Sequence, residues 1–397
     1  MQLTLIGMGG GAETLTAEAL AALRAADAVL GAQRLLDALP AGVTARRRAA
    51  YRPDDIVGQL EQWGCERAAV VYSGDTGFYS GAQGLLARVE GLGWAVRVCP
   101  GISSVQLLAA ALGRPWQGWR LVSAHGRECD AVAECLYGQP TFFLTGGGET
   151  PASLCAALTA AGLGDVDVTV GESLGSEKQK ITRSTAREAA QTDFDPLSVL
   201  LVEAVTPAVR RAPGWPDEAF IRGDVPMTKQ EVRAAVLAKL AIAENDCVWD
   251  VGAGTGSVSV EAAAIAKRVF AVECEAEACR LIEQNRAKFG AYNLTVIEGR
   301  APEALTDLPA PDAVFLGGTK GELAAIADAA LAKNPNVRLC AAAIALETLS
   351  AAVAAFTAHG LTAEVTQIAV SRTRAAGRLH LLMANNPVFL ITGGGAQ

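Results

Sequence analysis

A glycine loop flanked by two acidic residues is the feature of the sequence best suited to binding a ligand. An apolar stretch ends at Asp250 and leads through the glycines into a helical pattern. Glycines at such a turn let a ligand approach the backbone, which a side chain would prevent. Glu273 ends the next apolar stretch, where a carboxylate can accept hydrogen bonds from both hydroxyls of a ribose. The spacing therefore predicts a nucleoside site. Its glycines are Gly252, Gly254 and Gly256.

The order of these glycines favours a single nucleoside over a dinucleotide. Dinucleotide-binding turns read Gly-x-Gly-x-x-Gly and aim a helix N-terminus at a pyrophosphate, whereas this loop reads Gly-x-Gly-x-Gly. The loop resembles that of class I S-adenosylmethionine methyltransferases. This resemblance implies that Asp250 orders the loop and faces the methionine ammonium group. It also implies that backbone at Arg300 or Ala301 contacts the adenine, and that small residues at Gly317 open space beside the sulfonium.

Three turns in the first half also place glycine and polar residues after apolar stretches. Each stands at the carboxyl end of an expected strand, the edge at which open α/β sheets bind ligands. Together these turns resemble the tetrapyrrole methylases, a class III S-adenosylmethionine family with two α/β lobes. The resemblance implies a second cofactor site between the lobes, which His125 faces from the second lobe. The first lobe would supply Gly7, Gly9, Gly74, Asp75, Phe78, Ile102, Ser103 and Ser104.

The order of the halves resembles a family of cobalamin (vitamin B12) biosynthesis, the precorrin-6Y methyltransferases (decarboxylating). The segments Phe220–Arg233, Phe315–Leu323 and Leu346–Thr348 carry this match in the second half. The family implies methylation of a precorrin, a tetrapyrrole, at carbon 5 by the first half. It assigns methylation at carbon 15, and loss of carbon dioxide from the carbon-12 acetate to give precorrin-8, to the second half. It further implies a homo-oligomer, up to a tetramer, assembled through the C-terminal domain.

Polar and basic residues near the start of the second half are candidates for binding the carboxylates of such a substrate. We expect Arg222, Thr228 and Lys229 to hold these carboxylates and to favour decarboxylation. A helix cap at Thr228 and Lys229 is the alternative. Arg233 follows Lys229 by one helical turn and is expected to extend the same cationic face.

Two other functions remain open. The class I half can act on tRNA or on a protein, although an acidic chain is a poor RNA ligand. Alternatively, one half is inactive and serves as a cofactor-binding module. Arg300 and Ala343 keep this alternative open, because relatives usually carry Asp and Asn there.

These residues need an α/β framework on both sides of a proline-rich break. Short apolar stretches alternate with helical patterns, which predicts parallel sheets covered by helices. We expect a two-lobed class III fold over residues 1–206, a linker over 207–219 and a Rossmann-like class I domain over 220–397. The final stretch, Val388–Ile391, is expected to add an edge strand. The other expected strands are Leu3–Ile6, Ala69–Tyr72, Val96–Cys99, Leu121–Ser123, Thr141–Leu144, Val166–Val170, Ser198–Val202, Cys247–Val251, Val269–Val272, Leu294–Ile297, Ala313–Leu316, Val337–Ala341, Ala363–Val370 and Leu379–Met383.

Composition narrows the possible classes of partner. The 397 residues carry a formal net charge of −8, which disfavours nucleic acid as the main partner. The nine cysteines form no Cys-x-x-Cys pair, so we expect reduced thiols, no metal site and the cytoplasm as compartment. The first residues have no basic start and only a short apolar run, so we expect no signal peptide, and no apolar stretch reaches the roughly 18 residues of a membrane span.

Overall fold

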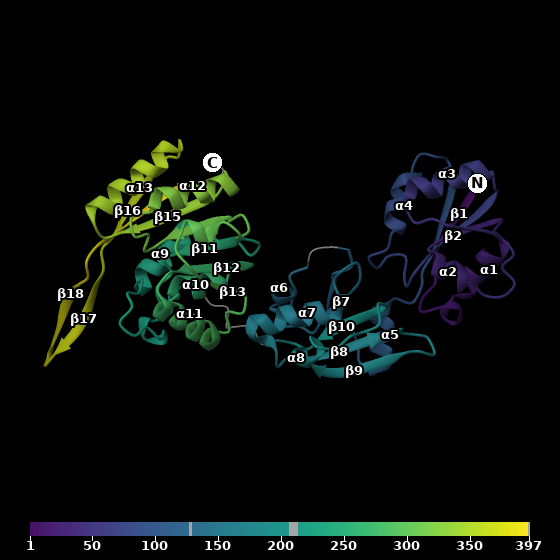
Figure 1. Cartoon of the computed structure of the whole chain (residues 1–397), viewed down its shortest axis with the longest axis horizontal. Helices are drawn as coiled ribbons and strands as arrows, with labels where there is room; N and C mark the ends of the chain where they lie inside the picture. The colour runs from purple at the N-terminus through teal and green to yellow at the C-terminus, as the bar shows by residue number, and fades with distance from the viewer. Residues whose placement is uncertain (127–128, 206–212, 396–397) are drawn as a thin grey trace. The chain divides into compact units, whose positions relative to one another are not determined.

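A computed structural model describes residues 1–126, 129–205 and 213–395, and the chain divides into two compact units (Figure 1). The N-terminal unit is Met1–Val205 and the C-terminal unit is Thr206–Gln397. Both combine helices with sheets, which confirms the expected α/β class. Residues 207–212 of the expected linker lie outside the described residues.

The first lobe of the N-terminal unit is a parallel sheet between two layers of helices. Its strand order is β3-β2-β4-β1-β5. Leu3 and Leu5 of β1 pack on the face covered by α3 and α4, whereas Ile6 packs on the opposite face with α1 and α2. This alternation is the period of two expected for a strand covered on both sides. The elements are β1 (Gln2–Gly7), η1 (Ala12–Thr14), α1 (Ala17–Ala25), β2 (Ala28–Gly31), α2 (Gln33–Asp37), β3 (Arg46–Ala49), α3 (Pro53–Trp63), β4 (Arg67–Tyr72), α4 (Ala82–Val89) and β5 (Ala95–Cys99).

The second lobe has a mixed sheet of order β6-β7-β10-β8-β9. Only β6 and β7 pair in parallel, and the remaining neighbours are antiparallel. The expectation of parallel sheets is therefore wrong here. β8 and β9 are antiparallel because the short connection 173–179 allows a hairpin but no crossover helix, and β10 inserts antiparallel between β7 and β8. The elements are α5 (Ser104–Leu112), β6 (Arg120–Ser123), α6 (Ala131–Cys135), β7 (Thr141–Leu144), α7 (Pro151–Leu158), η2 (Thr159–Leu163), β8 (Asp167–Glu172), β9 (Lys180–Thr185), α8 (Ala186–Ala189) and β10 (Ser198–Val202).

The C-terminal unit is built on a sheet of order β13-β12-β11-β14-β15-β19-β16, whose first five strands are parallel. Helices α9, α10 and α11 pack on one face, and α12 and α13 pack on the other. Val248 and Trp249 of β11 point to opposite faces accordingly. The elements are η3 (Asp217–Ala219), α9 (Gln230–Leu240), β11 (Cys247–Val251), α10 (Ser257–Ala263), β12 (Arg268–Glu273), α11 (Ala276–Phe289), β13 (Leu294–Glu298), η4 (Glu303–Leu305), β14 (Ala313–Leu316), α12 (Leu323–Lys333), β15 (Arg338–Ala343), α13 (Leu346–Ala358), β16 (Glu364–Ile368) and β19 (Val388–Gly394).

The last strand, β19, is not the edge strand expected from Val388–Ile391. It lies between β15 and β16 and is antiparallel to both. Leu390 packs in the core of one face of the sheet and Ile391 in that of the other, so both faces of the strand are buried. A continuous apolar run of this kind is typical of a central strand. Between β16 and β19 the chain forms a two-stranded hairpin, β17 (Ser371–Ala376) and β18 (Leu379–Ala384), which projects from the unit (yellow in Figure 1).

The loop after β11 lies directly against the loop after β14. Gly252 has a φ of 74°, and a Cβ on it would come 2.3 Å from the carbonyl oxygen of Gly318. Only glycine satisfies both the left-handed backbone and this close approach.

We predict that Gly252→Ala destabilises the C-terminal unit by at least about 3 kcal/mol, because a steric overlap adds to the cost of the backbone conformation. Gly321→Ala is the matched control, since Gly321 also has a positive φ, 92°, but a Cβ there would meet nothing within 4 Å. The control should cost about 1 kcal/mol. Urea unfolding followed by hydrogen exchange of peptides from residues 213–395 measures both. Equal losses would show that the loop contact is unimportant.

Candidate active sites

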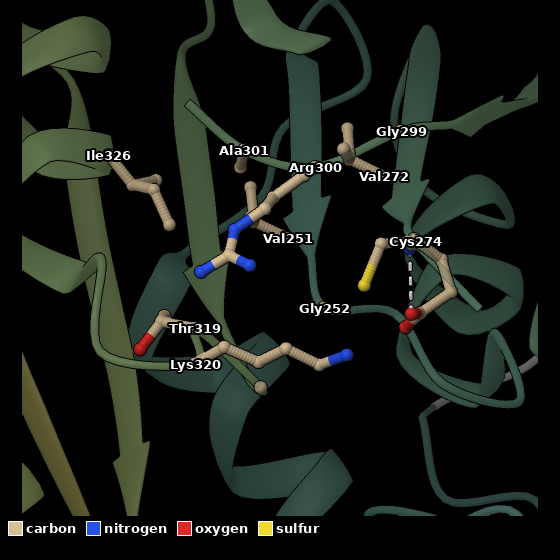
Figure 2. A pocket seen from close by; sticks show the side chains of 12 residues that line it. Val251, Gly252, Val272, Cys274, Gly299, Arg300, Ala301, Thr319, Lys320 and Ile326 are labelled. Atoms are coloured by element: carbon tan, nitrogen blue, oxygen red, sulfur yellow. Dashed lines mark hydrogen bonds between the residues drawn. The ribbon is translucent and has the colours of Figure 1, made fainter. Parts of the chain in front are cut away.

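An open pocket lies at the carboxyl edge of the C-terminal sheet (Figure 2). The ends of β11, β12, β13 and β14 form it, together with the start of α12. Four predicted site residues line it, namely Gly252, Glu273, Arg300 and Ala301, whereas Gly318 lines it in place of its predicted neighbour Gly317. Its complete lining is Val251, Gly252, Val272, Glu273, Cys274, Gly299, Arg300, Ala301, Gly318, Thr319, Lys320 and Ile326.

Glu273 connects the glycine loop to the loop after β12. Its Oε2 accepts a hydrogen bond from the backbone N of Gly254 at 2.9 Å. Its Oε1 accepts from the backbone N atoms of Cys274 and Glu275 at 2.8 and 3.0 Å. These bonds fix the carboxylate in orientation at the pocket wall, and Oε2, which accepts only one of them, retains lone-pair capacity for a hydroxyl donor. This arrangement fits a ribose.

Asp250 lies beneath the glycine loop and is 1% exposed. Its Oδ2 accepts a hydrogen bond from Ser259 of α10, while Oδ1 has no hydrogen-bond partner among the described residues. Burial raises the pKa of Asp250 from 3.8 to about 7. An unpaired buried oxygen fits a cationic or water donor at this position, so the expectation that Asp250 faces an ammonium group stays a prediction.

Asn285 of α11 is a buried side chain that sequence reasoning missed. Its Nδ2 donates to the backbone O of Ile221 at 2.7 Å and to that of Thr255 at 2.9 Å. Its Oδ1 accepts from the backbone N of Ile221 at 2.8 Å. Asn285 thus joins the segment that enters the unit to the glycine loop. A single Asn on the apolar face of a helix is the sequence signal that could have identified it.

Arg233 does not extend a cationic face with Lys229, so that expectation is wrong. Arg233 is 0% exposed, and its Nε donates to Oε1 of Glu261 at 2.6 Å. Its Nη1 contacts Asp217 at 3.3 Å and donates to the backbone O of Thr228 at 2.6 Å. A buried guanidinium must be paired in this way because desolvation of an isolated charge is prohibitive. Arg233 therefore fixes the turn before α9.

Of the candidate substrate residues, Arg222 is exposed, and Thr228 and Lys229 are half-buried. Lys229 is the N-cap residue of α9, and its side chain makes no capping hydrogen bond. The same segment reaches the glycine loop, because a Cβ on Gly254 would lie 3.0 Å from the backbone O of Pro226. The fold brings this turn to the carboxyl edge of the sheet, beside the loop that carries Gly254. A substrate role for the three side chains stays a prediction.

In the first lobe, the loops after β1, β4 and β5 meet at the carboxyl edge of the sheet. Gly9 and Gly74 exchange backbone hydrogen bonds of 3.0 and 3.1 Å. A Cβ on Gly7 would come 2.6 Å from the backbone N of Gly101 and 2.7 Å from the backbone O of Gly74. Asp75 accepts from the backbone N of Gly101 through Oδ2 at 3.1 Å. Glycines and one carboxylate therefore hold the three loops together.

The other predicted cofactor residues of the N-terminal unit make local contacts of different kinds. Phe78 packs against Phe142 of β7, with ring centroids 6.2 Å apart. Ser103 is buried and caps α5 in a reciprocal arrangement with Gln106. Ser104 is the first residue of that helix. Ile102, just before the cap, is 37% exposed. The ring of the exposed His125 bonds the backbone O of Thr145 in its own lobe at 3.2 Å.

Within 1–126, 129–205 and 213–395, no group of three or more His, Cys, Asp or Glu side chains is placed to hold a metal ion. In the same ranges, no helix has the length and apolar character that crossing a bilayer requires.

The raised pKa of Asp250 predicts a loss of stability as the pH rises. The unfolded chain ionises Asp250 near pH 3.8, whereas the folded chain resists ionisation up to about pH 7. Between these values each pH step favours the unfolded state, and the total cost is about 4 kcal/mol. We expect Asp250→Asn to lose less unfolding free energy than the unmodified chain between about pH 5 and about pH 8. Urea titrations followed by hydrogen exchange test this, and parallel pH curves would contradict it.

Comparisons with known proteins cover both units of the chain. The family described as tetrapyrrole (corrin/porphyrin) methylases matches residues 2–190, and the family described as precorrin methyltransferase domain matches residues 218–392. A probable cobalt-precorrin-6B C(15)-methyltransferase (decarboxylating) from Pyrobaculum calidifontis is 46% identical over 45% of this chain and 95% of its own. The crystal structure of a precorrin-6Y C5,15-methyltransferase from Geobacter metallireducens is 37% identical, covers 47% of this chain and 98% of its own, and has a TM-score of 0.45.

A relative from Sinorhizobium sp extends across both units. It is named precorrin-6Y C(5,15)-methyltransferase (decarboxylating) and is 33% identical over 350 residues, which are 86% of this chain and 84% of the relative. The resemblance inferred from the glycine loops and from the order of the halves is confirmed. The chain therefore belongs to the family of precorrin-6Y C(5,15)-methyltransferases (decarboxylating), methyltransferases of cobalamin biosynthesis.

Proposed function

We propose that each unit binds one S-adenosylmethionine and that the two units methylate different carbons of one precorrin. The N-terminal unit methylates carbon 5. The C-terminal unit methylates carbon 15 and removes carbon dioxide from the carbon-12 acetate, which gives precorrin-8. The observation that carries the proposal is the pocket lined by Gly252 and Glu273, in which an oriented carboxylate lies beside a loop that Gly252 holds against Gly318.

The chemistry asks for positioning more than for a strong base. S-adenosylmethionine supplies an electrophilic methyl group, and the bridge carbons of the reduced macrocycle are already nucleophilic. The protein must then align the reacting atoms at about 3–3.5 Å and exclude water. Glu273 and the glycine loop serve this role in the C-terminal unit, while Arg222, Thr228 and Lys229 bind peripheral carboxylates and favour loss of the carbon-12 carboxylate.

In the N-terminal unit, the proposed cofactor residues are those of the three converging loops. Gly7 lets the loop after β1 pack against Gly101, Gly9 and Gly74 join two of the loops by backbone hydrogen bonds, and Asp75 fixes the loop after β4 against that after β5. Phe78, Ile102, Ser103, Ser104 and His125 complete the proposed site. None of the nine cysteines, all of which lie within the described residues, forms a disulfide; this supports a reducing compartment, and we place the protein in the cytoplasm.

Single substitutions should separate the two activities. Glu273→Ala removes a carboxylate bond to the ribose worth about 1.5–3 kcal/mol, so methylation at carbon 15 and decarboxylation should be lost while carbon 5 methylation continues. Asp75→Ala should have the converse effect, and each variant is the control for the other. Mass spectrometry of the products of reduced precorrin-6 counts methyl groups and carboxylates. If either folded variant loses both methylations, the assignment of one carbon to each unit fails.

We also propose that the chain self-associates, up to a tetramer, through its C-terminal unit. The β17–β18 hairpin supports this, because it projects from the unit and every residue of β18 is exposed (Figure 1). Its apolar side chains include Leu379, 66% exposed, and Leu382, 76% exposed. Burial of such side chains stabilises an interface by about 25 cal/mol per Å². Arg372 anchors the base of the hairpin through a bidentate ion pair with Glu231 of α9, at 3.0 and 2.7 Å.

We predict that Leu382→Asp shifts the protein to smaller assemblies, because the substitution places a charge in an apolar interface. Leu197→Asp is the matched control, since Leu197 is 53% exposed but belongs to the N-terminal unit. Light scattering coupled to size exclusion, at several concentrations, gives the mass of each variant. An unchanged mass for Leu382→Asp, or the same loss for both variants, would show that the hairpin is not the interface.

A further inference from the structure

Two basic side chains extend across the C-terminal pocket from loops on either side of the glycine loop (Figure 2). Arg300 follows β13 and Lys320 follows β14, and they are the only basic residues among the residues that line this pocket. Lys320 Nζ pairs with Oε1 of Glu275 at 2.5 Å, and Arg300 Nη2 pairs with Oε1 of Glu322 at 3.5 Å. The two cations line the pocket, whereas their two acidic partners are not among its lining residues.

The left-handed backbone conformation of Lys320 indicates that its side chain has a functional role. Lys320 has a φ of 47°, a left-handed conformation that glycine adopts without cost and that lysine resists. The adjacent residue, Gly321, also has a positive φ. The ion pair offers little stability in return, because the Lys320 and Glu275 side chains are 50% and 66% exposed. A purely structural role therefore leaves the choice of lysine unexplained.

The charges of S-adenosylmethionine and of the tetrapyrrole indicate which of these two ligands Lys320 and Arg300 bind. S-adenosylmethionine carries a sulfonium and an ammonium group, so a lysine and an arginine beside it raise the local positive potential. A tetrapyrrole with acetate side chains is a polyanion and lowers that potential when it arrives. Hydrogen bonds with the Glu275 carboxylate and the Cys274 thiol raise the pKa of Lys320, which keeps the ammonium group charged.

We propose that Lys320, assisted by Arg300, is a specificity-determining residue that receives a peripheral carboxylate of the tetrapyrrole at the mouth of the methyl-donor pocket. The incoming carboxylate replaces Glu275 as the partner of Lys320, and the macrocycle is thereby held beside the donor. This inference rests on the proposed function and adds to it a carboxylate subsite distinct from Arg222, Thr228 and Lys229.

Two substitutions with opposite expected effects test this subsite. Lys320→Met removes the cation at nearly constant length and should raise the KM for reduced precorrin-6 in carbon 15 methylation by about fivefold. Glu275→Gln frees Lys320 from its competitor and should lower that KM. Lys267→Met is the charge-matched control and should leave the KM unchanged, because Lys267 is exposed just before the start of β12, at the opposite edge of the sheet.

Calorimetry with S-adenosylhomocysteine separates substrate binding from cofactor binding. We expect the dissociation constant of the N- and C-terminal sites for this product to stay within about twofold in all three variants. An unchanged KM in Lys320→Met overturns the inference, as does a loss of S-adenosylhomocysteine affinity equal to the change in KM, which would assign Lys320 to the cofactor. If the unmodified chain itself leaves carbon 15 unmethylated, the proposed function is wrong, and the carboxylate subsite is then wrong as well.

Discussion

The close approach of neighbouring loops at the carboxyl edges of the sheets is the constraint on which both sites depend. In the C-terminal unit, Gly252 lies against Gly318, and Glu273 joins the glycine loop to the loop after β12. In the N-terminal unit, Gly7 lies against Gly101, and Asp75 joins the loops after β4 and β5. Two sheets of different order thus use the same device, in which absent side chains permit backbone contact and one carboxylate fixes the result.

Much of this arrangement could be predicted from the sequence, because it depends on local patterns. The strands β7, β10, β11 and β14 have the bounds expected from their apolar residues. The parallel sheet of the first lobe and the parallel part of the C-terminal sheet follow from alternation with helices. The glycine loop and Glu273 were expected at one edge, since consecutive parallel strands place their carboxyl ends together, and they are joined there by a hydrogen bond.

The remainder depends on contacts between residues far apart in the sequence. Strands β2, β3, β9 and β17 were missed, and the exposed Arg46–Ala49 of β3 carries no apolar signal at all. The antiparallel pairing of β10 follows from the order in which strands join the sheet, which no local pattern encodes. The burial of Arg233 was also unpredictable. An arginine on a helix is expected at the surface, and the two carboxylates that permit its burial, Glu261 and Asp217, come from other elements of the fold.

The shared carboxylate of Asp217 limits how this protein can change in evolution. Asp217 contacts the buried Arg233, and Arg372 at the base of the hairpin pairs with it at 3.2 Å. Glu261 completes the set by binding Arg233 and the backbone N atoms of Gly214 and Trp215. Replacement of Arg233 leaves the Glu261 carboxylate buried without a counterion, and replacement of Asp217 or Glu261 leaves the buried guanidinium with one carboxylate instead of two. Descendants of this chain are therefore constrained to keep the buried trio Asp217, Arg233 and Glu261 or to exchange its members together.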